Sequence, residues 1–347
     1  MRVVTLKELV RRAAATTHTP EEVASKVVTS LVDLSCKELD QGNRVEIDKA
    51  LAPLALRRPP TGGAKAAASA APARPEGYKI SLVMPKKDFF ASLVANRLSG
   101  PRSKAEVFEG VETFMGSLSG SRPDLVVVDG SLSGAKDLVR ALKRSKDTSM
   151  VAIILVRSEG TGPVRGDGLR ICEDESVTEP FELSELVELA EAEIRRCQEE
   201  RTFFHHQVHF QLPTRDDAIE EANDTIAAVV EQSGMSEERG AALAVAFREA
   251  ADNAARHGNK SQESRMIDVV YLLDKEKVTI TVMDEGDGFD TEMYLRRGVH
   301  GNAVAVARER NEAGRVGGLG IMLMLKCLDN LEYNYAGNQV KLTKFVK

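Results

Sequence analysis

The sequence of 347 residues lacks a long apolar run, a paired cysteine spacing and an excess of positive charge. The longest apolar run, residues 151–156, is far shorter than the roughly 18 residues of a membrane span, so no membrane partner is expected. The four cysteines lie far apart, without the spacing of a zinc site or a disulfide framework. A formal net charge of -6 argues against nonspecific nucleic-acid binding by the whole chain. No apolar signal core follows Arg2, and we expect a reduced, cytoplasmic environment.

The composition fits a soluble α/β multidomain protein, with 42% hydrophobic and 29% charged residues. Residues 59–77 are rich in Ala, Pro and Gly and show no periodicity, which predicts a flexible linker. We therefore expect three domains, at 1–58, 78–200 and 203–347.

The first 58 residues predict a small α-rich domain. Thr5–Glu8 and Thr19–Glu22 have the pattern of helix N-caps, and residues 44–48 read as a short strand. This order resembles the N-terminal half of the HU/IHF family of DNA-bending proteins. The basic arm of that family is missing, because residues 50–60 take its place. A dimerisation or docking module is favoured, and DNA association through residues 1–58 stays as a rival interpretation.

The region from Tyr78 to about residue 200 alternates between strand and helix patterns. Such alternation predicts a doubly wound parallel sheet. The expected strands are 79–84, 105–108, 125–129 and 150–156, and the expected helices are 89–98, 111–118, 135–144 and a last one containing Leu183 to Ile194.

This middle region resembles a response-regulator receiver domain. Asp129 follows the third strand and matches the phosphoacceptor aspartate of that family, while Glu179–Phe181 matches its Lys-Pro-Phe with glutamate in place of lysine. Only Asp88 stands near the acidic pair that would hold magnesium. Asp129 is therefore a candidate phosphoacceptor without its usual partners, and a receiver-like scaffold for protein contacts is favoured.

The C-terminal region centres on a helix within residues 247–259. Glu249, Asn253 and His257 recur at steps of four and so share one helix face, while Gly258 ends the helix. A carboxylate one turn from a carboxamide suits proton abstraction beside a metal-bound phosphate. Taken alone, the pattern fits an ordinary surface helix equally well.

Two glycine-containing segments follow. Asp284–Asp290 comes after two expected strands, 266–273 and 278–283, and its Asp284 could accept a hydrogen bond from an exocyclic amine. Residues 314–320 precede a predicted helix, where glycines leave backbone N–H groups free to bind phosphate. Each segment alone also fits a plain turn or a flexible helix start.

In their order, these three motifs resemble the N box and the two glycine boxes of the GHKL ATPase family, and among its members the anti-sigma-factor serine kinases. The resemblance covers about residues 208–347 and implies a two-layer α/β sandwich of the Bergerat type. It implies a mobile ATP lid at 294–316, and it implies ATP and Mg²⁺ as cofactors. The implied roles are Glu249 as catalytic base, Asn253 as magnesium ligand, Asp284 with Gly286 and Gly288 at the adenine, Gly317, Gly318, Leu319 and Gly320 at the phosphates, and Arg315 at the γ-phosphate.

The resulting hypothesis is an ATP-dependent serine/threonine protein kinase acting on a protein partner. The resemblance implies a STAS-domain antagonist as substrate, a sigma factor as a further partner, and a homodimer as one assembly. A histidine kinase is disfavoured because His18, His205 and His206 do not lie on a two-helix hairpin. A non-catalytic ATP-binding module and a DNA-associated regulator remain the alternatives.

Overall fold

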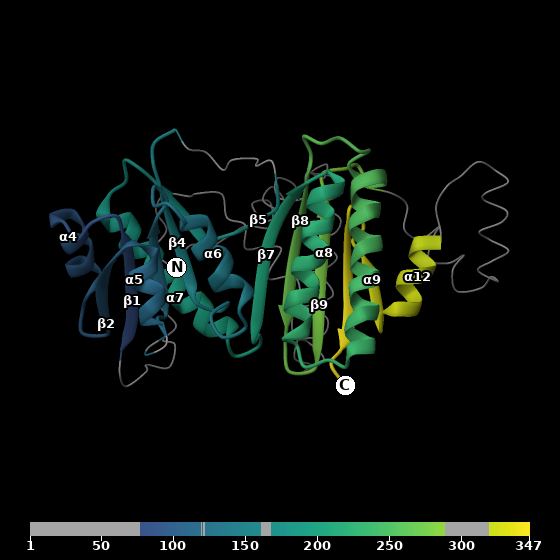
Figure 1. Ribbon diagram of the computed structural model, residues 1–347, viewed down its shortest axis with the longest axis horizontal. Coiled ribbons are helices and arrows are strands. Elements are labelled where there is room, and N and C mark those ends of the chain that lie inside the picture. The colour runs from purple at the N-terminus through teal and green to yellow at the C-terminus, as the bar shows by residue number, and fades with distance from the viewer. Residues whose placement is uncertain (1–76, 119, 121, 161–167, 289–318) are drawn as a thin grey trace, which may run out of the picture. The chain divides into compact units, whose positions relative to one another are not determined.

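The computed structural model describes residues 77–118, 120, 122–160, 168–288 and 319–347 (Figure 1). The segment 1–58 that was predicted to be HU-like, the predicted linker up to residue 76 and the predicted lid 294–316 lie outside the described residues. Arg315, Gly317 and Gly318 lie outside them as well. Within the described part of the chain, no helix is both long and apolar enough to span a membrane.

The middle region forms a five-stranded parallel sheet in the order β2-β1-β3-β4-β6. This is the flavodoxin-like order of a doubly wound fold, so the predicted architecture is confirmed. β3 is Leu-Val-Val-Val-Asp with four buried residues in a row, as expected for a strand covered on both faces. The strands are β1 (Tyr78–Met84), β2 (Ser103–Glu109), β3 (Leu125–Asp129), β4 (Ala152–Arg157) and β6 (Glu175–Thr178).

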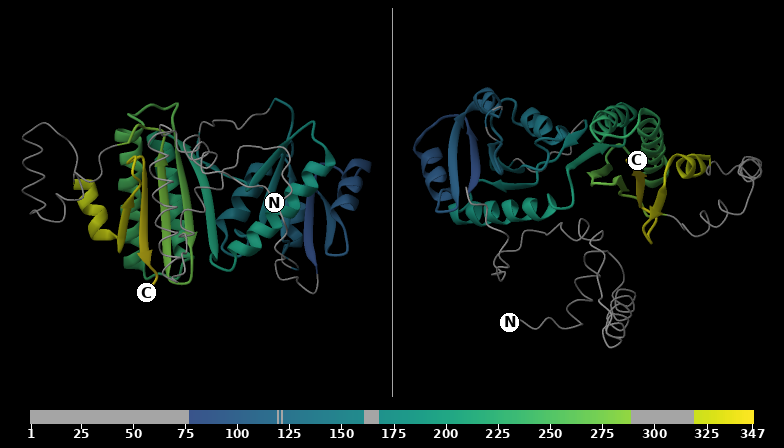
Figure 2. Two further views of the ribbon diagram at one scale, coloured as in Figure 1. Left: turned by 180° about the vertical axis from the view of Figure 1, so that it is seen from behind. Right: turned by 90° about the horizontal axis from the view of Figure 1, so that it is seen from below.

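In the part of this region that the structure describes, two helices cover each face of the sheet (Figure 2). Neighbouring residues of β1 point to opposite faces, so Leu82 packs with α4 (Phe89–Leu98) and α7 (Leu183–Glu200). Val83 instead packs with α5 (Gly110–Ser117) and α6 (Ala135–Arg144). Since α4 and α7 both follow parallel strands, both begin at the carboxyl edge of the sheet.

The C-terminal region forms an antiparallel sheet in the order β10-β11-β9-β8-β7-β5. Among the described residues, three helices pack on one face of it, which confirms the predicted two-layer sandwich (Figure 1). Strands β10 and β11 extend the sheet beyond the strands predicted from the sequence. The elements are β7 (His206–Pro213), α8 (Asp216–Glu231), α9 (Glu237–Asn253), η2 (Ala254–Gly258), β8 (Met266–Leu273), β9 (Lys277–Asp284), α12 (Leu319–Cys327), β10 (Asn330–Tyr333) and β11 (Gln339–Phe345).

A short strand from the middle region completes the edge of the C-terminal sheet. β5 (Arg170–Ile171) pairs antiparallel with β7, and Cys172 N donates to His209 O at 2.8 Å. Helix α6 adds an ion pair of 2.7 Å between Arg140 and Glu221 of α8. Strand β5 and helix α6 therefore tie the two sheets together.

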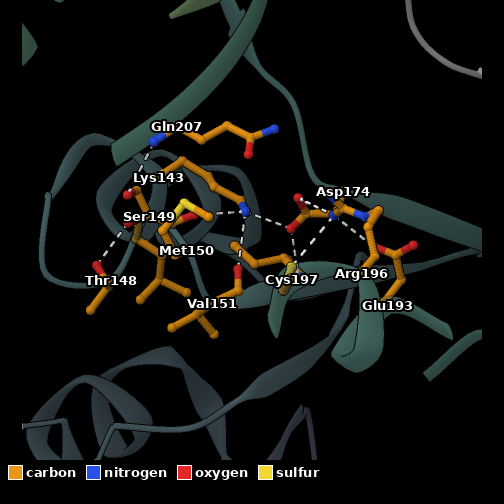
Figure 3. Close-up of polar contacts among 12 residues, drawn as sticks. Lys143, Thr148, Ser149, Met150, Val151, Asp174, Glu193, Arg196, Cys197 and Gln207 are labelled. Atoms are coloured by element: carbon orange, nitrogen blue, oxygen red, sulfur yellow. Dashed lines mark hydrogen bonds and ion pairs between the residues drawn. The ribbon is translucent and has the colours of Figure 1, made fainter. Parts of the chain in front are cut away.

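A buried ion-pair network stabilises this connection (Figure 3). Lys143 Nζ donates to Asp174 Oδ2 at 2.5 Å and to two backbone carbonyls, while Arg196 donates to Asp174 Oδ1 at 2.9 Å. Burial works to raise the pKa of Asp174, but the two cations outweigh it and the pKa lies below its usual value. Asp174 also accepts from Ile153 N at 2.8 Å, so the network holds the segment after β5 against β4.

Candidate functional site

Helix α9 presents the first pair of predicted site residues. Its N-cap is Ser236, whose hydroxyl accepts from Arg239 N, and its apolar stripe, which includes Phe247, is buried against the sheet. Glu249 and Asn253, one turn apart at the edge of this stripe, are both half-buried. The next turn is a π turn, a feature that is frequent at functional sites.

The start of α12 lies against this pair. A Cβ atom on Gly320 would be 2.5 Å from Glu249 Oε2 and 3.4 Å from Asn253 Nδ2. Leu319 is the first residue of the helix, so the free backbone N–H groups of its first turn belong to this neighbourhood. The structure thus brings together one residue of the second glycine box and two of the N box. They lie more than sixty positions apart in the sequence.

Asp284, the first residue of the first glycine box, lies against Gly258 at the end of the helix formed by α9 and η2. Its Oδ1 accepts from Gly286 N at 2.8 Å. A Cβ on Gly258 would lie 2.2 Å from Asp284 Cγ, and one on Gly286 would lie 2.2 Å from Gly258 O. Gly258, predicted as a helix stop, is therefore also required by the carboxyl group of Asp284.

Burial raises the pKa of Asp284 to about 6, although the Gly286 N–H and the charge of Arg265 both work to lower it. Tyr333 on β10 lies close enough to Asp284 for its own pKa to be affected by that carboxylate. Burial first, and then the charge of Asp284, raise its pKa to about 12. Asp284 therefore lies in a poorly solvated position, where a hydrogen-bond donor on a ligand would stabilise the carboxylate.

Asn259 was missed by the sequence analysis and holds this end of the site together. Its buried side chain donates to Thr214 Oγ1 at 2.8 Å and to Met266 O at 3.0 Å, and accepts from Glu285 N at 2.8 Å. It thereby links the end of α9 and η2 to the residue after Asp284. Lys260, the next residue, has a positive φ of 55°, which marks a sharp turn here. An asparagine beside the helix-ending glycine was the available sequence signal.

Gly288 faces a different part of the chain. Its φ is +75°, and a Cβ there would lie 1.7 Å from Ala336 O in the turn between β10 and β11. Asp284 N also donates to Asn338 O at 3.0 Å. The first glycine box is thus packed against this turn, and the adenine-binding role assigned to Gly288 stays a prediction.

Asp129 lies apart from these motifs, at the end of β3. Its Oδ1 accepts from Ser131 N at 2.8 Å and from Ser131 Oγ at 2.6 Å. The residue that follows β6 is Glu179, an anion. These contacts are those of a structural turn, and phosphorylation of Asp129 stays a prediction.

One cluster in the described residues has ligand types suited to a metal ion, namely Asp174, Glu193 and Cys197. Arg196 donates to both carboxylates, so their charges already have a cationic partner. Burial, followed by the charge of Asp174, raises the pKa of Cys197 to about 12, which disfavours the thiolate that a metal would need. We interpret the cluster as a structural ion-pair network.

Comparisons with known proteins find sequence similarity in the C-terminal region. Residues 212–344 match the histidine kinase-like ATPase domain. Serine-protein kinase RsbW of Listeria monocytogenes serovar 1/2a is 29% identical over 144 residues, which cover 41% of this chain and 88% of that protein. RsbW of Staphylococcus aureus strain MSSA476 is 24% identical over 143 residues, which cover 40% of this chain and 87% of that protein. The resemblance to the GHKL family and to its serine kinases is confirmed for this region.

The solved structures similar to this chain include a putative response regulator from Chloroflexus aurantiacus J-10-fl. Its sequence identity is 18% and its TM-score is 0.30, and the match covers 35% of this chain and 99% of that one. The CheY4 chemotaxis response regulator of Vibrio cholerae matches with 14% identity and a TM-score of 0.29, over 34% of this chain and 98% of that one.

Proposed function

We propose that this protein is an ATP-dependent serine/threonine protein kinase that phosphorylates a protein partner. The observation that supports this most directly is the position of Gly320 against Glu249 and Asn253. A helix N-terminus able to bind phosphate, a carboxamide and a carboxylate then lie together, which are the groups that phosphoryl transfer to a hydroxyl requires.

Each group has a role that its chemistry suits. Glu249 accepts the proton of the attacking hydroxyl, and the carboxamide oxygen of Asn253 holds the magnesium ion. Asp284 accepts a hydrogen bond from the exocyclic amine of adenine. When bound, Mg-ATP supplies the phosphoryl group and the metal charge that offsets the negative charge of the phosphates.

The glycines of the site support the fit of a nucleotide. Gly258, Gly286 and Gly320 each occupy a position where a Cβ would collide with a polar group of the site. A larger residue at any of these three positions would displace the Asp284 carboxyl, the Gly258 carbonyl or the Glu249 carboxylate, which belong to the proposed site.

For the protein substrate we propose a serine on a STAS-domain antagonist, with a sigma factor as a second partner. This rests on the similarity to serine-protein kinases named RsbW, whose length the match covers almost completely. The middle region and residues 1–58 then direct or gate the kinase.

The test is ATP binding by calorimetry, together with phosphate transfer to purified STAS-domain proteins of the same organism. We expect Glu249→Ala to bind ATP but to transfer phosphate ~10²–10⁴-fold more slowly, the usual contribution of a general base. We expect Asn253→Ala to lose magnesium-dependent ATP binding. Glu238→Ala, on the exposed first turn of the same helix, is the matched control and should behave as wild type.

Equal transfer rates for Glu249→Ala and wild type would overturn the assigned base. ATP binding without transfer to any serine or threonine would instead favour a non-catalytic nucleotide-binding module.

A further inference from the structure

Helix α4 of the middle region carries an unusual exposed apolar surface. Phe89 is 83% exposed, Phe90 48% and Leu93 45%, although the helix packs through Ala91, Val94 and Leu98 onto the sheet. Phe90 and Phe89 precede Leu93 by three and four positions, so each is a neighbour of Leu93 on the helix surface. Exposed aromatic clusters of this kind mark interaction surfaces, since burying them is favourable and nothing in the fold requires them to face water.

The charges around this cluster are mostly basic, with Asp88, the exposed N-cap of the helix, as the one acidic residue among the described neighbours in sequence. Lys86 and Lys87 precede the helix and Arg97 lies in its last turn, and all three are exposed. We call the aromatic cluster with these three residues the basic-aromatic patch. Its sign is opposite to that of the whole chain, whose net charge is -6. An acidic surface is therefore its electrostatic complement.

Such an acidic surface lies on the adjacent helix. Glu182, the N-cap of α7, and Glu185, Glu188 and Glu191 within its first half are all exposed. Between them lie the partly buried apolar residues Leu183 and Val187. We call these four glutamates the acidic stripe. Helices α4 and α7 pack side by side on the same face of the sheet (Figure 2).

The geometry allows a second copy of the chain to contact the basic-aromatic patch and the acidic stripe at the same time. Lys86 and Lys87 lie at the N-terminal end of α4, and Glu182 and Glu185 lie at the N-terminal end of α7. Both ends are at the carboxyl edge of the parallel sheet. A two-fold axis between these helix ends would place the basic-aromatic patch of each copy on the acidic stripe of the other. The same contact is then made twice.

We propose that the chain forms a two-fold symmetric dimer through the face made by α4 and α7, with the basic-aromatic patch of each copy on the acidic stripe of the other. Phe89 and Phe90 are the central apolar anchors, and the charges around them set the orientation. The dimer pairs two kinase regions through their middle regions. The proposal does not depend on the kinase activity.

A pair of charge-reversal variants of the full chain tests this. Lys86→Glu with Lys87→Glu makes the patch acidic like the stripe. Glu182→Lys with Glu185→Lys makes the N-terminal end of the stripe basic like the patch, while Glu188 and Glu191 stay acidic. We expect each variant alone to lose the concentration-dependent association of the wild type in sedimentation equilibrium. An equimolar mixture should form a heterodimer, because each patch then meets its opposite charge. Nucleotide binding serves as the folding control and should not change in either variant.

Phe89→Asp tests the apolar anchor and should weaken association at least ~10-fold, as loss of a central aromatic residue does. Met115→Asp is the matched control, since Met115 is 40% exposed on α5, on the other face of the sheet. The proposal is overturned if the wild type stays monomeric, if the charge reversals leave association unchanged, or if the mixture does not associate. Capture of a different acidic protein by a monomeric wild type would assign the patch to another partner.

Discussion

Gly258 lies so close to Asp284 that a Cβ atom on the glycine would be 2.2 Å from Cγ of the carboxyl group. The end of the α9–η2 helix and the end of β9 are therefore in direct contact at the residue proposed to bind adenine. The contact explains why a residue without a side chain is needed at this point, beyond ending a helix.

Gly258→Ala is expected to weaken nucleotide binding by about tenfold or more, because the new methyl group must displace the Asp284 carboxyl. The backbone of Gly258 is helical, so alanine itself is not strained there, and the stability cost should be that of overpacking, about 1–3 kcal/mol. Calorimetric titration with ADP measures the affinity. Gly116→Ala, where the added Cβ meets nothing within 4 Å, is the control and should leave affinity unchanged. Wild-type affinity in Gly258→Ala would contradict the proposed role of the contact.

Gly320→Ala is expected to reduce phosphate transfer more than nucleotide affinity. The new Cβ would lie 2.5 Å from Glu249 Oε2, and this carboxylate can rotate away, so the chain should still fold. Alanine also favours a helix over glycine, by about 1 kcal/mol. The misplaced base should slow transfer by roughly 10²-fold, since catalysis requires close alignment. Single-turnover transfer, with ADP affinity measured in parallel, separates the two effects. An unchanged transfer rate would show that Glu249 is not positioned against Gly320 during the reaction.

Nucleotide affinity should depend on pH through Asp284, whose pKa is raised to about 6 by burial. The ionised carboxylate is the form that accepts hydrogen bonds best, because protonation converts one of its oxygens into a donor. The affinity for the nucleotide should therefore be highest above pH 7. It should fall as the pH drops through 6, approaching tenfold per pH unit. Titration with adenosine, which carries no phosphate to titrate, measures this directly. Asp284→Asn should be weak and should lack this pH dependence, and an equally steep decline in that variant would assign the proton to another group.

Asn259→Ala should lower both stability and nucleotide affinity, because the buried carboxamide makes three hydrogen bonds. Its loss leaves the Glu285 N–H and the Thr214 hydroxyl without this partner, at a cost of about 2–3 kcal/mol. Urea unfolding followed by circular dichroism is suitable, as the chain contains no tryptophan. Asn330→Ala removes an exposed hydrogen bond to Glu332 and should change stability by less than about 0.5 kcal/mol. Similar costs for the two variants would argue against a special role for Asn259.

Lys143→Met should be strongly destabilising, by about 3–5 kcal/mol, because it leaves the buried Asp174 carboxylate without one of its two cations (Figure 3). Adding Asp174→Asn should recover part of the loss. Lys136→Met, on the exposed face of the same helix, is the control. Because the pKa of Asp174 is lowered on folding, its contribution is complete above the pKa of an unfolded aspartate. That contribution is lost as the pH falls through the lower folded value. A small effect of Lys143→Met at neutral pH would show that Arg196 alone suffices.

Strong local patterns were enough to predict most elements. The β3 run of buried valines and the α4 and α6 periodicities have the predicted bounds, since burial on a sheet or on one helix face imposes its period on the sequence. β5 was not predicted because a strand of two residues shows no period, and it forms only because β7 presents an edge to it. β10, with four residues, is similarly short.

The residues of the candidate site likewise include some that local patterns could predict and some that they could not. Glu249, Asn253, Asp284 and Gly320 were chosen as candidates from residue types and motif order, through the family that this order resembles, and their roles stay predictions. Asn259 and the second role of Gly258 were not, because their importance comes from contacts with residues 26 positions away, which no local pattern contains.

The sequence by itself was enough to predict the two fold types, to choose the candidate site residues and to recognise the resemblance of the C-terminal region to the histidine kinase-like ATPase domain. These depend on short-range periodicity and on residue types at fixed spacing. Only the tertiary structure decided that Gly320 meets Glu249, that β5 joins the two sheets, and that a basic-aromatic patch lies beside an acidic stripe. Those relationships depend on which distant segments pack together, and packing is a property of the whole folded chain.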